Sequence, residues 1–250
     1  MAIPASLRPR PLAHAALLLM VTFAACSRES KSSVDGEANS RTEGPRPTPV
    51  EIWNEFNGNL AMDAVKQQVA CGPRPAGSPA LAQAREKITT ALTGFGWVTE
   101  LQPFAAETPY GEVTMTNIIA RFPATKGQAP NPASQQVLVA SHYDTKKFTT
   151  ISFVGANDGA SSTGALLELA RVLALDPSLA SKVELVFFDG EEALQQFTEK
   201  DGLYGSRHYA SALRESGRGA QFKYGILWDM IGDKDLTVTL PLDSPKELTQ

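Results

Sequence analysis

"SSTGALLELARVLALDPSLASKVELVFFDGEE", residues 161–192, places a helical pattern directly before a short apolar run that ends in three carboxylates. The helical pattern rests on apolar residues at the right spacing, namely Leu166, Leu169, Ala170 and Leu173. Two runs resemble "VELVFF" (183–188): "QVLVA" (136–140) and "YGILW" (224–228). Runs without polar alternation suit central strands that are covered on both faces. Strand, helix and strand in this order predict an α/β sheet.

The segment before these runs predicts one more helix and two strands. Residues 78–96 carry apolar side chains on one helical face, with Ser78 placed to cap the helix and Pro79 suited to its first turn. "WVTELQPF" (97–104) and "EVTMTNIIARF" (112–122) are strand-like, and the intervening "TPYG" has the composition of a turn.

The composition is that of a globular protein with one good-sized domain. The chain has 250 residues, of which 42% are hydrophobic and 20% charged, and its formal net charge is −4. It has no basic patch or arginine-rich tract, so nucleic acid is not expected as a partner.

The first 50 residues have a different composition and predict export. A short basic region precedes an apolar run at 15–25 that is too short to span a bilayer, and Cys26 follows two alanines. We expect residues 1–25 to be a signal peptide and Cys26 to be lipidated, which anchors the protein to a membrane facing the periplasm or the cell exterior. Simple secretion is the alternative. Residues 26–50 are polar and proline-rich, so a flexible tether is expected before a domain at 51–250.

One histidine and several carboxylates follow the predicted strands or precede the helix at 161–175. They are His142, Asp144, Asp158, Asp189, Glu191, Glu192 and Asp229. Because ligands bind at the carboxyl ends of the strands in such sheets, we expect these side chains to converge there. Carboxylates gathered without a cation would raise one another's pKa. Imidazole and carboxylate donors without thiolate suit a catalytic zinc ion.

The adjacent glutamates, Glu191 and Glu192, are expected to have different roles, because neighbouring side chains at a strand end point apart. One can bind metal while the other faces the substrate as a base. Three of the other residues have a simpler reading on their own: Asp158 as a helix N-cap, Asp229 as a loop carboxylate and His142 as a structural side chain. Convergence on one edge of the sheet favours the joint site.

Seven motifs occur in order and carry a family resemblance. They are "CGPRPAGSPA", "TPYG" before "NIIA", "SHYDTK", "FVGANDGASSTGALLELARVL", "LVFFDGEEA", "DGLYGSRHYA" and "WDMIG". Together they resemble the glutaminyl-peptide cyclotransferases (glutaminyl cyclases), which are related to the two-zinc aminopeptidases of peptidase family M28. The resemblance implies a three-layer α/β/α fold around a central mixed, mostly parallel sheet.

The resemblance also implies roles for the site residues. Asp158 and Glu192 match the zinc ligands of the cyclases, and Glu191 matches the glutamate that transfers protons. Asp229 matches a catalytic aspartate that hydrogen-bonds near the substrate.

A second metal site is the point at which the two enzyme types differ. His142 and Asp144 match residues that the aminopeptidases use at this second site, and the cyclases keep them while holding a single zinc. One zinc ion is therefore expected for a cyclase. Two are expected for an aminopeptidase, in which His142 and Asp229 would join the ligands.

Several positions depart from the family pattern. Phe197 stands where cyclases commonly have a tryptophan in the substrate pocket, and Ser141 and Thr163 stand where animal enzymes carry a disulfide. The third zinc ligand of the family is a histidine from a later loop that this sequence does not contain, and His208 does not match it and is expected to be structural. We therefore expect a domain that is incomplete at its C-terminus, binds zinc weakly and has little activity alone.

The expected reaction is zinc-dependent cyclisation of an N-terminal glutamine to pyroglutamate, with release of ammonia. The expected partners are the N-termini of peptides or proteins. One alternative is a zinc aminopeptidase, and another is an inactive remnant, which the missing histidine suggests. Neither the natural substrate nor the oligomeric state follows from the sequence.

Overall fold

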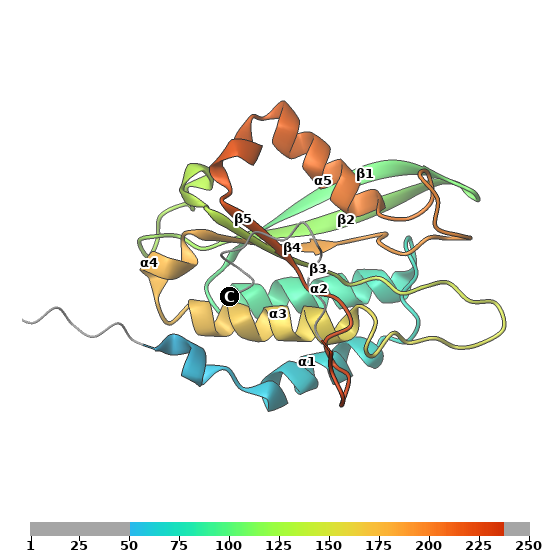
Figure 1. The fold of residues 1–250 in the computed structure, drawn as a ribbon, viewed down its shortest axis with the longest axis horizontal. Coiled ribbons are helices and arrows are strands. Elements are labelled where there is room, and N and C mark those ends of the chain that lie inside the picture. The colour runs from blue at the N-terminus through green and yellow to red at the C-terminus, as the bar shows by residue number, and fades with distance from the viewer. Residues whose placement is uncertain (1–50, 238–250) are drawn as a thin grey trace, which may run out of the picture. The chain divides into compact units, whose positions relative to one another are not determined.

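The computed structural model describes residues 51–237. The predicted signal peptide, the tether with Cys26, and residues 238–250 of the predicted domain lie outside the described residues. Within residues 51–237 the chain forms one five-stranded sheet with helices packed against it (Figure 1). The strands are β1 (Val98–Thr108), β2 (Gly111–Arg121), β3 (Val137–His142), β4 (Val183–Phe188) and β5 (Tyr224–Leu227).

The sheet is mixed, with its strands in the order β1-β2-β4-β3-β5. β2 pairs antiparallel with both β1 and β4, whereas β3 pairs parallel with both β4 and β5. Four of the described strands therefore run in one direction and β2 runs in the other. The predicted mixed, mostly parallel sheet is confirmed, as are the predicted strands.

Helices cover both faces of the sheet. α1 (Gly58–Val69), α2 (Pro79–Gly94) and α3 (Ala160–Leu173) lie on one face, and α5 (Tyr204–Glu215) lies on the other (Figure 1). The short elements are α4 (Pro177–Ala180) and the 3₁₀ helices η1 (Ile52–Glu55), η2 (Pro132–Ser134) and η3 (Arg218–Gln221). This arrangement confirms the three-layer α/β/α fold.

Helix α2 begins where the sequence indicates. The Ser78 hydroxyl accepts a hydrogen bond from the Leu81 amide at 3.1 Å, and Pro79 occupies the first turn. The apolar side chains on its inner face, among them Ile88 and Leu92, are fully buried. The helix predicted from residue 78 is thus confirmed.

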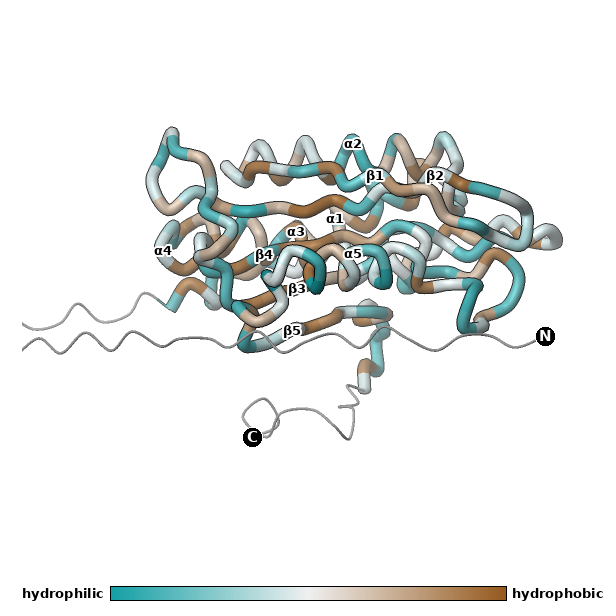
Figure 2. Tube along the Cα trace, turned by 90° about the horizontal axis from the view of Figure 1, so that it is seen from above, coloured by the Kyte–Doolittle hydropathy of each residue, from teal (hydrophilic) through white to brown (hydrophobic). Residues whose placement is uncertain are grey.

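The packing of β4 explains why its sequence shows no alternation of apolar and polar residues. Leu185 and Phe187 pack into the core beneath α2 and α3, whereas Val186 and Phe188 pack with Tyr209 of α5. Side chains alternate along a strand, so both faces of β4 are apolar because helices cover both. Figure 2 shows this hydrophobic band along the central strands.

Helix α3 is buried on nearly every side because α1 covers the face that the sheet does not. Gly164 lies at the contact with α1, where an added Cβ would meet the Ala61 carbonyl oxygen at 2.7 Å and Val65 Cγ2 at 2.8 Å. Only glycine allows this approach of the two helices. No helix was predicted at α1, whose buried residues, Val65 and Gln68, both contact α3.

Strand β5 differs from its prediction. The run at 224–228 was expected to be covered on both faces, but within residues 51–237 β5 is an edge strand whose residues alternate between half-buried and exposed. Leu227 is 63% exposed. An apolar run indicates that a strand can be covered, but burial itself depends on which neighbours pack against it.

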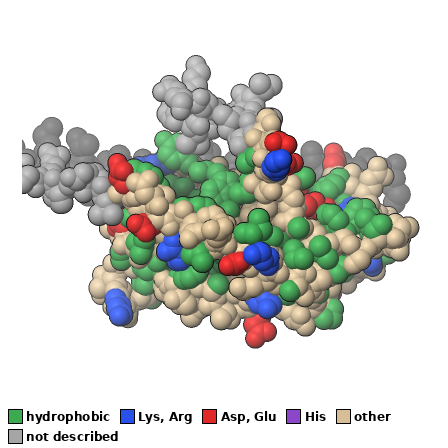
Figure 3. Space-filling model, turned by 90° about the horizontal axis from the view of Figure 1, so that it is seen from below, with side chains coloured by type: hydrophobic (Ala, Val, Ile, Leu, Met, Phe, Trp, Pro, Cys, Tyr) green, Lys and Arg blue, Asp and Glu red, His purple; other side chains and the backbone are tan. Residues whose placement is uncertain are grey.

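Figure 3 shows the face of the domain on which α1 lies, with hydrophobic side chains spread between charged ones. The large exposed apolar residues of η1 and α1 and the segment between them are Trp53, Phe56, Leu60 and Met62. None of the helices between residues 51 and 237 is long and apolar enough to cross a membrane.

Candidate active site

The topology creates a crevice at the carboxyl ends of β3 and β4. The chain leaves β3 for α3 on one face of the sheet, and it leaves the neighbouring β4 for α5 on the opposite face. Adjacent parallel strands whose connections diverge in this way form the usual ligand site of an α/β sheet. His142 ends β3, and Glu191 and Glu192 follow β4. The predicted convergence at this edge is therefore confirmed for these residues.

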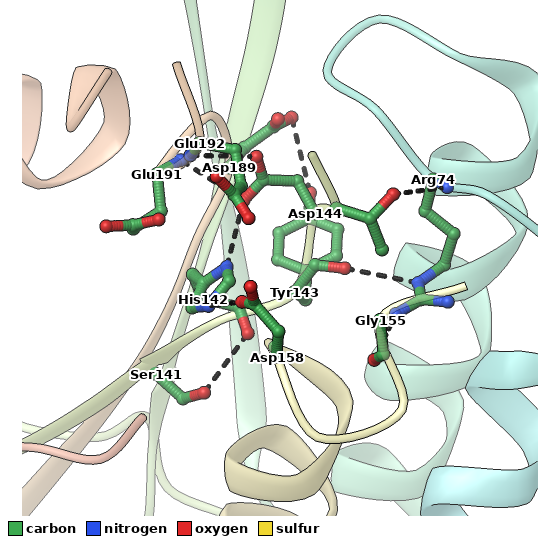
Figure 4. A network of polar contacts seen from close by, with 12 residues as sticks. Arg74, Ser141, His142, Tyr143, Asp144, Gly155, Asp158, Asp189, Glu191 and Glu192 are labelled. Atoms are coloured by element: carbon green, nitrogen blue, oxygen red, sulfur yellow. Dashed lines mark hydrogen bonds and ion pairs between the residues drawn. The ribbon is translucent and has the colours of Figure 1, made fainter. Parts of the chain in front are cut away.

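Three predicted residues form a compact group at this edge. One ligand atom each from His142, Asp158 and Asp229 lies within 4.8 Å of the other two. His142 Nε2 is 3.2 Å from an Asp158 oxygen and 3.3 Å from an Asp229 oxygen. Figure 4 shows His142 and Asp158 facing each other below the two glutamates.

The structure excludes the simpler reading of Asp158 as a helix cap. Gly159 is the N-cap of α3, no side chain caps the helix, and Asp158 instead faces His142. Gly159 has a φ of 80°, and an added Cβ would lie 2.8 Å from the Asp144 carbonyl oxygen and 3.0 Å from His142 Cε1. Glycine is therefore required for Asp158 to enter the site.

The charges within this group are unbalanced. Burial by itself lowers the pKa of His142, but hydrogen bonds to Asp144, Asp158 and Asp229 outweigh burial and raise this pKa well above its usual value. The hydrogen bond from His142 in turn lowers the pKa of Asp158. The carboxylates thus draw a positive charge onto the imidazole.

The same donors suit a divalent metal ion. One imidazole and two carboxylates, with no thiolate, form a donor set typical of catalytic zinc. A divalent cation bound here would balance the negative charge of the carboxylates around His142. The described residues therefore include a three-residue group that fits a metal ion.

Asp144 fixes the backbone of the two glutamates. It is fully buried, and its Oδ1 accepts from the Glu191 amide at 3.1 Å while its Oδ2 accepts from the Glu192 amide at 3.2 Å. Oδ1 is also 3.3 Å from His142 Nδ1. The resemblance matched Asp144 to a residue of a second metal site, and here both of its oxygens face N–H groups. In this structure Asp144 connects the end of β3 to the loop after β4.

Glu191 and Glu192 lie in different surroundings, as the sequence led us to expect. Glu192 is 8% exposed, and burial, followed by the charge of Asp158, raises its pKa to about 8. Glu191 is half-buried, and burial raises its pKa. Glu192 does not belong to the three-residue group, although its charge interacts with that of Asp158.

Asp189 belongs to a separate cluster, although it was expected to converge with the other carboxylates. Its Oδ2 accepts from the Thr116 amide at 2.7 Å and from the Tyr143 hydroxyl at 3.4 Å, and it lies 3.8 Å from Arg85. Its Oδ1 is buried without a hydrogen-bond partner in the described structure. Burial, followed by the charge of Asp144, raises the pKa of Asp189 to about 7.

Arg74 was not identified from the sequence, yet it holds the site loops together. Its guanidinium is fully buried and donates to the carbonyl oxygens of Gln68, Gly72, Tyr143 and Val154, with Gly155 at 3.5 Å (Figure 4). These bonds connect the end of α1, the end of β3 and the loop before α3. "CGPRP" reads as a surface turn, and no local signal indicates that its arginine is buried.

The loop after Glu192 carries the predicted pocket residue, Phe197. Asp201 orders this loop by accepting from the amides of Leu194, Gln195 and Gln196 and from the Tyr204 hydroxyl. The Phe197 ring lies against Gly202, where an added Cβ would be 2.6 Å from the ring and 3.3 Å from the Glu191 carbonyl oxygen. Phe197 is exposed and close to the Glu191 backbone.

Other residues that the sequence singled out occupy supporting positions. His208 stacks on Phe104 with ring centroids 4.4 Å apart and is not part of the three-residue group, which agrees with a structural role. Ser141 and Thr163 are buried with their hydroxyl oxygens 3.2 Å apart. The pair that the resemblance matched to a disulfide is therefore adjacent in space. Cys71 is free and half-buried.

Known proteins with similar sequences include glutaminyl-peptide cyclotransferases and proteins named as similar to them. The chain is 34% identical over 193 residues to the glutaminyl-peptide cyclotransferase-like protein of Bos taurus, covering 73% of this chain and 46% of that protein. It is 30% identical over 199 residues to the glutaminyl-peptide cyclotransferase of Dictyostelium discoideum, covering 74% and 55%. The chain thus spans about half the length of the curated relatives it matches.

Solved structures include both enzyme types. A glutaminyl cyclase from an Acidobacteriales bacterium is 35% identical, with a TM-score of 0.69 over 84% of this chain and 69% of that chain. A leucine aminopeptidase precursor from Bacteroides thetaiotaomicron is 26% identical, with a TM-score of 0.60 over 72% and 64%. Residues 117–247, just over half of the chain, match the family described as peptidase family M28. The chain therefore belongs to peptidase family M28.

Proposed function

We propose that this protein cyclises the N-terminal glutamine of peptides or proteins to pyroglutamate and releases ammonia. The observation that carries the proposal is the position of Glu191 beside the three-residue group of His142, Asp158 and Asp229. The pKa of this carboxylate is raised, and Asp144 accepts a hydrogen bond from its backbone amide. The named relatives at 30–34% identity support cyclisation over other reactions of the family.

We assign one zinc ion to this site, held by Asp158 and Glu192. His142 and Asp229 are ligands in addition if a second ion binds. When bound, zinc would polarise the γ-amide carbonyl of the substrate. The buried position of Glu192 beside the charge of Asp158 supports this assignment, because a cation between the two would relieve their repulsion.

The protein's own side chains would carry the proton. Glu191 would accept a proton from the α-amine of the substrate and deliver it to the departing ammonia. A raised pKa suits a group that must both accept and release a proton near neutral pH, and such catalysis contributes about 10²–10⁴-fold. The Asp144 bond to the Glu191 amide keeps this carboxylate in place. Asp229 would hydrogen-bond near the substrate, and Phe197 would form part of its pocket.

The reaction needs no external nucleophile, because the amine and the amide belong to the same residue. The site has only to orient them and exclude water, and such positioning can supply a large part of the rate enhancement. Arg74 and Asp201 support this function by fixing the loops on either side of Glu191.

A zinc aminopeptidase is the second candidate, and one observation favours it. His142, Asp158 and Asp229 lie together, so His142 and Asp229 would be in position to join the ligands if a second ion binds. Glu191 would then activate a metal-bound water for hydrolysis. The number of metal ions per chain distinguishes the candidates, with one expected for the cyclase and two for the aminopeptidase.

The cellular location is also a proposal. The apolar run at 15–25 and Cys26 support an exported lipoprotein, with residues 26–50 as the tether to the domain at 51–250. Secretion without an anchor is the alternative.

The zinc-loaded protein should be incubated with a glutamine-initiated and a leucine-initiated peptide, and the products weighed. Loss of one ammonia from the first peptide alone supports the cyclase. Loss of a residue from either peptide supports the aminopeptidase. The Glu191→Gln variant is the matched control, and product formation at the wild-type rate in this variant would contradict the role of Glu191.

A further inference from the structure

Aromatic and lysine side chains lie on the loops that follow β3 and β4 and on the turn between β1 and β2. We name them the lysine–aromatic rim, which consists of Tyr110, Lys146, Lys147, Phe148 and Phe197. Its aromatic members are 46–59% exposed. Large apolar side chains that are exposed in one patch often mark a binding surface.

Contacts within the rim join three separate segments. The Lys146 ammonium donates to the Ala193 carbonyl oxygen and lies 5.3 Å from the Phe197 ring centroid. The Lys147 ammonium lies 5.1 Å from the Tyr110 ring centroid. The loop after β3 therefore contacts both the loop after β4 and the turn between β1 and β2.

The rim lies at the same edge of the sheet as the site. β1 runs in the direction of β3 and β4, so the turn after it reaches that edge (Figure 1). Lys147 is three residues from Asp144, and a chain extends at most about 3.6 Å per residue. The Cα of Lys147 therefore lies no more than about 11 Å from that of Asp144, which accepts from the Glu191 amide, and about three residues of an extended peptide span that distance.

Charge changes sign between the site and its rim. The site presents carboxylates, which suit the α-ammonium group of a peptide, whereas the rim presents two ammonium groups. Neither lysine forms an ion pair with a carboxylate of residues 51–237, although Glu107 and Glu112 flank the turn that carries Tyr110. The exposed ammonium of Lys147 is therefore available to a ligand, whereas that of Lys146 already donates to the Ala193 carbonyl oxygen.

We infer that the lysine–aromatic rim binds the peptide chain that follows the N-terminal glutamine and selects an acidic side chain at its second or third residue. This inference rests on the proposed function, since it assumes a peptide N-terminus in the site. An exposed carboxylate–ammonium pair favours the acidic peptide over a neutral one by about two- to fivefold. A lysine at the same peptide position is disfavoured by like charge.

The test compares three C-terminally labelled peptides that begin with glutamine and differ only in their second residue, which is Glu, Leu or Lys. Fluorescence anisotropy gives the Kd of each peptide for the zinc-loaded protein, and ammonia release is measured in parallel. We expect affinity in the order Glu, Leu, Lys, with differences that shrink as salt screens the charges.

Two variants locate the effect. Lys147→Met should bring the Glu and Leu peptides to about equal affinity. Lys182→Met removes the same charge before β4, at the opposite end of that strand, and should leave the order unchanged. Equal affinity of all three peptides for the wild type, absence of binding, or an order that Lys147→Met does not alter would overturn the inference. Binding in the expected order without ammonia release would refute the proposed cyclisation and leave the rim's preference established.

Discussion

Replacing Asp144 by asparagine should lower the free energy of unfolding by about 3 kcal/mol, because this carboxylate holds the loop that carries both glutamates. The wild-type side chain accepts from the amides of Glu191 and Glu192 and lies next to His142 Nδ1. An asparagine keeps one acceptor and turns the other into a donor. In the least disruptive rotamer, its NH₂ group would face the Glu192 amide.

The magnitude follows from this count of partners. One hydrogen bond to a charged acceptor is lost, which costs about 1.5–3 kcal/mol. The other bonds become neutral and roughly half as strong. Asp144 is fully buried, so water cannot replace the lost acceptor.

Urea unfolding with linear extrapolation measures the difference. Asp63→Asn is the matched control, because Asp63 forms only an exposed pair with Lys66 and its loss should change stability by less than about 1 kcal/mol. Equal stabilities of the two variants would refute the supporting role of Asp144. The loop would then be held by other contacts.

Three further predictions concern groups outside the reacting centre. Burial raises the pKa of Asp189 to about 7, so the folded state keeps a proton that the unfolded state releases above about pH 4, and the free energy of unfolding falls by up to about 4 kcal/mol as pH rises to 7. Asp189→Asn should weaken this pH dependence in denaturation curves recorded at pH 5 and pH 7. An unchanged difference between the two pH values would contradict the assignment of Asp189 as a buried protonated carboxyl group. His208→Ala should leave the Kd for zinc unchanged in a competition with a chelator, since His208 stacks on Phe104 and lies outside the three-residue group. A weaker affinity for zinc in this variant would indicate that His208 is a ligand. Cys26→Ser should move the protein from the membrane to the soluble fraction, whereas identical partitioning of variant and wild type would favour simple secretion.

The features that the sequence predicted correctly depend on local pattern. Apolar runs without alternation marked the strands, and Ser78 and Pro79 marked the start of α2. The positions of His142 and the two glutamates at one edge of the sheet were predictable, because each follows the carboxyl end of a strand and such ends meet at one edge of a parallel sheet. These signals lie within a few residues of the features that they predict.

The features that the sequence did not predict depend on contacts between distant segments. Arg74 meets carbonyl groups from the loop before α3, some 80 residues later, and "CGPRP" carries no mark of that burial. Asp189 lies outside the three-residue group because its carboxylate accepts from the Thr116 amide of β2 and from the Tyr143 hydroxyl. Burial of β5 likewise depends on its neighbours and cannot be read from its own residues.

If Glu192 binds zinc while Glu191 acts as a base, as we propose, the two residues differ in their effect on the affinity for zinc. Glu191→Gln and Glu192→Gln remove the same charge from adjacent residues, so the loss of long-range attraction for the ion is similar in both. Competition with a chelator gives the Kd of each variant for zinc. We expect a Kd for zinc at least about tenfold weaker for Glu192→Gln than for Glu191→Gln. Equal weakening in both variants, or greater weakening in Glu191→Gln, would contradict the assignment.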